Sequence, residues 1–126
     1  MLFKSVTLYI KLSQSVMDRI ILFQFQTSEI SVNIEAYFKD QKLIVEGYDI
    51  GKSVENWFGD SDYEYSTTIS EEEVNKLYQL LEVKDGDKEG LLKAIAAEYN
   101  NNSCYSSFRK FLDENEIKYE SFSWTY

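Results

Sequence analysis

The chain has 126 residues, of which 44% are hydrophobic and 16% aromatic, and its formal net charge is −9. This length and composition predict one globular domain over residues 1–126 with one sizeable core. The negative charge disfavours nucleic acids and anionic membranes as direct partners and favours a basic protein.

The sequence contains no histidine and a single cysteine, Cys104. Because histidine is the most common general base and metal ligand, its absence predicts a binding protein that is not an enzyme and needs no cofactor. Cys104 has no cysteine to pair with and no histidine to activate it, so we expect a buried apolar side chain near a helix start. The N-terminal apolar runs are too short and interrupted for a signal peptide or a membrane span. Together with the lone cysteine, this predicts a cytoplasmic protein.

Hydrophobic and polar residues alternate along the first half of the chain, the pattern of half-buried strands. We predict four strands, over residues 6–12, 21–26, 30–38 and 43–48. In the second of these, Ile21, Phe23 and Phe25 should share the face opposite Leu22. The polar gaps are short, so the four strands should form an antiparallel meander. A fifth strand is predicted over residues 62–69, with Tyr63, Tyr65, Thr67 and Ile69 on one face.

The second half of the chain carries helical patterns. Ser70 is predicted to cap a first helix, with Glu73 completing a capping box, and this helix should end near Val83. A second helix is predicted from Asp87 to about residue 99, and a third over residues 103–115. Alternation returns over residues 117–126 and predicts a last strand. The sequence therefore predicts an α+β domain, an antiparallel sheet of five to six strands with two to three helices on one face.

Acidic and aromatic residues are concentrated between residues 43 and 75. This segment holds nine carboxylates and one lysine, a local charge of −8 out of −9 for the chain. Carboxylates attract a basic protein and aromatic rings supply contact area, so we predict a partner-binding face here. Its predicted residues are Tyr48, Asp49, Trp57, Asp60, Asp62, Tyr63, Glu64 and Tyr65. The alternative is an ordinary solvated surface, with Trp57 and Phe58 packed into the core.

Two further interpretations of the carboxylates stay open. Asp60, Asp62, Glu64 and Glu71 fall at positions 1, 3, 5 and 12 of a calcium-loop template, which would make the chain a metal-responsive domain. Tyr65 occupies position 6, where that template needs glycine, and the alternation favours a strand instead of a loop. A pair of carboxylates at this spacing is also compatible with a small hydrolase, although nothing in the sequence marks a cleft.

The stretch from Gly47 to Ser53 is a near miss to a phosphate-binding loop. The motif requires four residues between its glycines, whereas three separate Gly47 from Gly51, and the charge of Glu46 would oppose a phosphate. We therefore expect the two glycines to turn the chain out of its fourth strand and Ser53 to cap a short helix.

Residues 45–55 and 58–65, with the string Gly-Asp-Ser-Asp-Tyr-Glu-Tyr from Gly59 to Tyr65, resemble a family of small bacterial proteins of unassigned function. Residues 108–112 and 117–122 are similar to the C-terminal end of that family, so the resemblance covers about residues 43–122. Small acidic bacterial proteins of this kind resemble immunity proteins, which neutralise a toxin by binding it. The resemblance implies a bacterial binding protein with a basic partner, and it supplies no activity.

Overall fold

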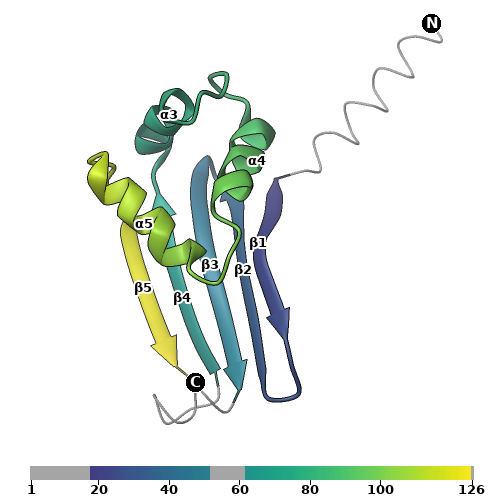
Figure 1. Ribbon diagram of the computed structural model, residues 1–126. Helices are drawn as coiled ribbons and strands as arrows, with labels where there is room; N and C mark the ends of the chain where they lie inside the picture. The colour runs from purple at the N-terminus through teal and green to yellow at the C-terminus, as the bar shows by residue number, and fades with distance from the viewer. Residues whose placement is uncertain (1–17, 52–61, 126) are drawn as a thin grey trace, which may run out of the picture.

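The computed structural model describes residues 18–51 and 62–125. A five-stranded antiparallel sheet runs through it in the order β1-β2-β3-β4-β5 (Figure 1). The strands are β1 (Arg19–Gln26), β2 (Ile30–Lys39), β3 (Lys42–Gly51), β4 (Asp62–Ile69) and β5 (Glu120–Thr125). The predicted strand over residues 6–12 and the predicted short helix after Ser53 lie outside the described residues.

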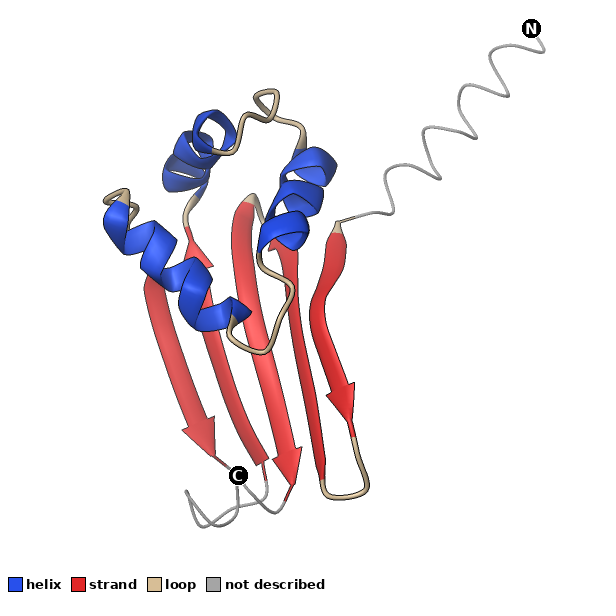
Figure 2. Cartoon of the chain, in the orientation of Figure 1, coloured by secondary structure: helices blue, strands red, loops and turns tan. Residues whose placement is uncertain are grey.

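Three helices lie on one face of this sheet: α3 (Glu71–Leu80), α4 (Lys88–Glu98) and α5 (Cys104–Glu114) (Figure 2). Helix α4 packs over β1 and β2, and α3 and α5 pack over β3. The predicted α+β class and the predicted helices on one sheet face are confirmed. Within the described residues, no helix is both long enough and apolar enough to cross a membrane.

The core lies between the sheet and the helices. Alternate residues of β2 and β3 point toward the helices, and each helix contributes an apolar stripe that meets them. The fully buried members of this core with the largest side chains are Phe108, Ile34, Leu43, Ile69, Leu77, Leu91, Leu92, Ile95 and Leu112. The opposite face of the sheet is not covered by any helix of the described residues. We call it the open face.

Strand β1 contains a β-bulge, so its side chains do not alternate regularly between the two faces as predicted. The pairing register with β2 shifts between Ile21 and Phe23, so that one extra residue is inserted into β1. As a result Leu22 is only 4% exposed and joins the core, whereas Ile21 is 51% exposed on the open face. A bulge breaks the period of two, so Ile21 and Leu22 lie on opposite faces as predicted, but Phe23 and Phe25 share the face of Leu22 and not that of Ile21.

The predicted capping box at the start of α3 is wrong, although Ser70 is the N-cap residue. The Ser70 side chain makes no capping hydrogen bond. The Glu73 carboxylate instead accepts a hydrogen bond from the backbone amide of Lys118 at 2.7 Å and forms an ion pair with Lys76 at 2.7 Å. These contacts lower the pKa of Glu73, the Lys76 contact most. Glu73 therefore ties α3 to the segment that enters β5.

Helix α3 ends at Leu80, three residues before the predicted end at Val83, and the chain then passes through a residue in the left-handed conformation. Glu82 has φ of +56°, and the amide of Val83 donates to the carbonyl of Tyr78 at 2.7 Å, the hydrogen bond of a Schellman motif. Helix α5 ends in the same way, with Glu116 at φ of +56° and the Ile117 amide bonded to Leu112. Glycine is the usual residue at this position, so the two glutamates gave no stop signal in the sequence.

Candidate functional site

The pairing of β3 with β4 divides the predicted partner-binding residues between two faces of the sheet. Successive side chains of a strand point to opposite sides. Tyr48, Asp62 and Glu64 therefore lie on the open face, while Asp49, Tyr63 and Tyr65 lie on the helix-covered face. Trp57 and Asp60 lie outside the described residues. The acidic and aromatic segment thus contributes to two separate surfaces.

The register of the sheet arranges the open face in rows across the strands. One central row runs Ile21, Glu35, Glu46, Ser66 and Phe122, and the adjacent row runs Gln24, Asn33, Tyr48, Glu64 and Trp124. These two rows bring carboxylates from β2, β3 and β4 together at the middle of the face. Large apolar side chains at their ends stay exposed, Phe122 by 58% and Trp124 by 42%.

Two glutamates face each other directly in the first of these rows. Glu35 and Glu46 are paired across β2 and β3, an arrangement of like charges that destabilises a sheet. Both have polar contacts: Glu35 forms an ion pair with Arg19, and Glu46 accepts a hydrogen bond from the Tyr37 hydroxyl at 3.1 Å. Burial, and then the Glu46 carboxylate, raise the pKa of Tyr37, so this hydroxyl stays a donor.

A hollow of about 290 Å³ opens beside this glutamate pair. Three of the residues that line it are carboxylates, two are large amphipathic rings on the same face, and the backbone of β3 contributes to its wall. The lining residues are Asn33, Glu35, Glu46, Gly47, Tyr48, Glu64, Tyr65 and Trp124. A negatively charged hollow with aromatic walls is suited to a cationic side chain, because carboxylates and aromatic faces both attract cations.

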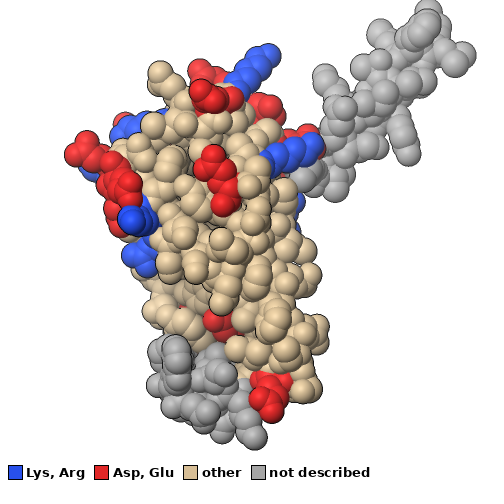
Figure 3. Space-filling view, in the orientation of Figure 1, with Lys and Arg blue, Asp and Glu red and all other residues tan. Residues whose placement is uncertain are grey.

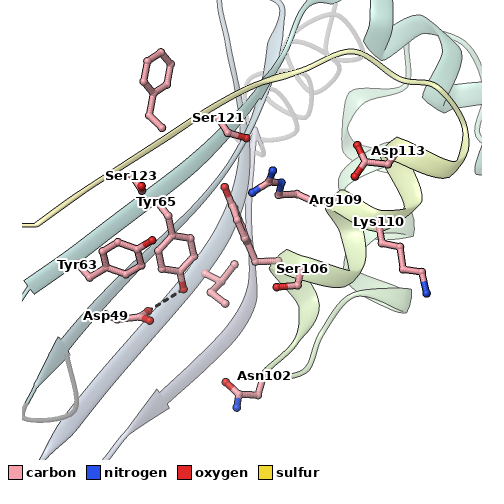
Figure 4. Close-up of a pocket in the computed structure, with 13 residues that line it drawn as sticks. Asp49, Tyr63, Tyr65, Asn102, Ser106, Arg109, Lys110, Asp113, Ser121 and Ser123 are labelled. Atoms are coloured by element: carbon pink, nitrogen blue, oxygen red, sulfur yellow. Dashed lines mark hydrogen bonds between the residues drawn. The ribbon is translucent and has the colours of Figure 1, made fainter. Parts of the chain in front are cut away.

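A larger cleft of about 640 Å³ lies on the helix-covered side, between α5 and strands β3 to β5. Charged side chains on this side gather over the helices, and the surface below them is mostly uncharged (Figure 3). The sheet wall of the cleft carries Asp49, Tyr63 and Tyr65, and the α5 wall carries Arg109 (Figure 4). Tyr105, one turn before Arg109 on α5, also lines the cleft. Three of the predicted partner-binding residues therefore line this cleft.

Tyr65 organises the sheet wall of the cleft. Its hydroxyl donates a hydrogen bond to Asp49 at 2.8 Å, and its ring meets Tyr105 edge-on with centroids 4.7 Å apart. Burial raises the pKa of the Asp49 carboxyl above its ordinary value, partly opposed by this hydrogen bond. Burial, and then the neighbouring carboxylate, raise the pKa of Tyr65, so the phenol remains protonated at neutral pH.

The Tyr65 ring lies directly over Gly47, its cross-strand partner. A methyl group at position 47 would overlap the ring. The prediction that Gly47 turns the chain out of its strand is wrong, since β3 continues through it to Gly51. Gly47 provides space for an aromatic ring, which is a common reason for glycine inside a strand.

Arg109 organises the helix wall of the cleft. Its guanidinium donates to the Tyr119 hydroxyl at 3.4 Å, and that hydroxyl donates to Asp113 at 2.7 Å. Its Nε is buried and has no hydrogen-bond partner among the described residues. A buried donor left without a partner costs about 1–3 kcal/mol. The guanidinium carbon also lies 5.9 Å from the centre of the Tyr105 ring, so the group is held close to the aromatic wall.

This cleft could not be predicted from local pattern, because its walls are far apart in the chain. The sequence has two arginines, Arg19 and Arg109, too few for a local pattern to indicate an anion site. A usable signal was present, since Tyr105 and Arg109 are four residues apart and must lie on the same side of a helix. The local sequence pattern does not indicate which strand that side of the helix faces.

The calcium-loop template does not match the fold of residues 62–71. Asp62 and Glu64 lie in the extended strand β4, Tyr65 continues that strand, and Glu71 lies in the first turn of α3. Asp60 is outside the described residues. Within residues 18–51 and 62–125, no group of three or more acidic or cysteine side chains is placed to hold a metal ion.

Comparison with protein-family models, with curated proteins and with solved structures finds no match to this chain.

Proposed function

We propose that this chain is a non-catalytic domain that binds a basic protein through the open face of its sheet. The observation that carries the proposal is the hollow beside Glu35 and Glu46, with Glu64 and Trp124 completing its rim. Its chemistry favours an arginine or lysine side chain of the partner, placed among the carboxylates and against an aromatic face.

The placement of the glutamates supports binding over a purely structural role. A directly opposed pair of like charges weakens the sheet that holds it. Arg19 already forms an ion pair with Glu35, so a cation from a partner would compensate the charge that remains on Glu46, and the free energy gained would appear as affinity. The exposed rings of Phe122 and Trp124 lie in the same two rows. Aromatic side chains of this kind are enriched among the residues that dominate binding energy at interfaces.

The resemblance of residues 43–122 to small bacterial proteins extends the proposal to a biological role. Such a domain would act in the bacterial cytoplasm by stoichiometric binding, as an immunity protein that neutralises a basic toxin. Charge on the open face would speed association with that toxin, and the aromatic side chains would slow dissociation.

The test begins with affinity capture of the tagged protein from its own cells, washed with increasing salt. The association of a retained basic protein is then measured by stopped flow for two charge-matched variants. Glu46→Gln with Glu64→Gln removes two charges from the open face, and Glu71→Gln with Glu72→Gln removes two from α3. We expect the open-face variant to associate about tenfold more slowly at low salt and the α3 variant to change little.

Trp124→Ala supplies a second, independent readout. Because this side chain contributes contact area and no charge, we expect faster dissociation with an almost unchanged association rate. The proposal fails if the two charge variants associate alike, or if no basic protein is retained near equimolar amount.

A further inference from the structure

The cleft between α5 and strands β3 to β5 lies on the opposite side of the sheet from the proposed partner surface. We propose that this cleft binds a small aromatic anion, whose carboxylate or phosphate is held by Arg109 and whose ring packs against the tyrosines. Its volume of about 640 Å³ falls within the range of small-molecule sites. This inference does not rest on the proposed function.

Arg109 is placed to receive the charged group. Its contact with Tyr119, which is fixed in turn by Asp113, orients the guanidinium and leaves Nε without a partner among the described residues. A guanidinium presents its donors as a planar fork that matches a carboxylate or a phosphate in two parallel hydrogen bonds. Nε itself is buried, so the terminal nitrogens of this half-buried side chain are the donors that an oxyanion in the cleft can reach.

Hydroxyl groups also line the cleft, and that of Ser121 lies 3.4 Å from the Thr67 hydroxyl. Ser106 comes from α5, and Ser121 and Ser123 come from the side of β5 that faces the helices. A serine hydroxyl donates one hydrogen bond and can rotate to suit its acceptor. Three hydroxyls and one guanidinium therefore give the cleft several donors for the oxygens of an anion.

The carboxylates of the cleft set the orientation of the ligand. Asp113 accepts from Tyr119, and Asp49 accepts from Tyr65 at the far wall. Asp49 would repel a negative group at the far wall, whereas repulsion from Asp113 is opposed by the positive charges of Arg109 and Lys110 on the same helix, so the anionic end belongs beside Arg109. The uncharged ring of the ligand then lies against Tyr63 and Tyr65, whose rings are 5.3 Å apart and tilted by 38°. Such surfaces bind planar groups by offset or edge-on stacking.

The test is a titration of the full-length protein, followed by backbone amide NMR, with benzoate, phenyl phosphate and neutral benzamide. We expect at least one of the two anions to shift the amides of Ser106, Arg109 and Ser121 and to bind about tenfold or more tightly than benzamide. Binding of benzoate alone would identify a carboxylate site, and binding of phenyl phosphate alone would identify a phosphate site. Binding of both would identify a general oxyanion site.

Two variants separate the role of Arg109 from a general effect of charge. Arg109→Gln should lower the affinity for the anion to the level of benzamide. Lys93→Gln, on α4 outside the cleft, should leave the affinity for the anion within about twofold of the wild-type value. Arg109→Lys keeps the positive charge but lacks the planar pair of donors, so it should bind the anion with intermediate affinity. Such an intermediate affinity also keeps the test valid if the glutamine variant misfolds. The inference is overturned if neither anion shifts the cleft amides at about 10 mM, or if Arg109→Gln and Arg109→Lys both bind as tightly as the wild type.

Discussion

Replacing Gly47 by alanine should destabilise the protein, contrary to the usual effect of this substitution in a strand. An alanine with ordinary backbone angles normally gains about 0.4–1 kcal/mol by reducing the entropy of the unfolded chain. Here the added methyl group would overlap the Tyr65 ring. Overpacking of this kind costs about 1–3 kcal/mol. Displacing the ring would also weaken the 2.8 Å hydrogen bond from Tyr65 to Asp49, a further loss of about 1 kcal/mol.

These contributions give a net loss of about 2 kcal/mol in the free energy of unfolding. With a urea dependence of about 2 kcal/mol per molar, the unfolding midpoint should fall by about 1 M. The measurement is urea unfolding followed by circular dichroism. The decisive control is the same change in a Tyr65→Ala background, where the methyl group meets no ring and should give the ordinary gain of about 0.4–1 kcal/mol. An equal cost in both backgrounds, or a variant as stable as the wild type, would refute the steric explanation.

Two further predictions concern buried or linking groups. Glu73→Gln should lower the stability at neutral pH because it removes the ion pair with Lys76. Since the folded pKa of Glu73 lies below its ordinary 4.5, the stabilisation is present above that value and is lost as the pH falls through the folded pKa. The difference between wild type and variant should therefore shrink in urea unfolding at about pH 3, and a constant difference would contradict the linkage. The Cys104 thiol is buried, and burial raises its pKa, so a thiol reagent should label it slowly in the native protein and readily in urea. Fast labelling of the native state would show that the thiol is reachable.

The elements with strong local signals could be predicted from sequence. Strand β4 follows the alternation of residues 62–69, and α4 starts after Asp87, whose carboxylate accepts from the amide of Gly90 at 2.9 Å. Both signals involve only neighbours in the chain, which is why pattern alone was sufficient.

The parts that could not be predicted depend on distant partners. The bulge at Leu22 arises from the way β1 pairs with β2, and Glu73 bonds to Lys118 instead of capping its own helix. The division of the predicted binding residues between two faces follows from alternation and could have been drawn from the sequence. That Asp49 and Tyr65 line one cleft with Arg109 could not be predicted, because this depends on where α5 crosses the sheet.

Strand β5 contributes to both surfaces, with Trp124 on the open face and Ser121 and Ser123 on the cleft. Within the described residues it pairs with β4 alone, so it is an edge strand and a favoured place for local unfolding. Opening of β5 would dismantle the partner surface and the cleft in one step. A ligand that binds either surface therefore stabilises the closed state of β5. By thermodynamic linkage, a ligand on one surface is expected to strengthen the binding of a ligand on the other surface. One short strand thus makes the two sides of the sheet energetically dependent on each other.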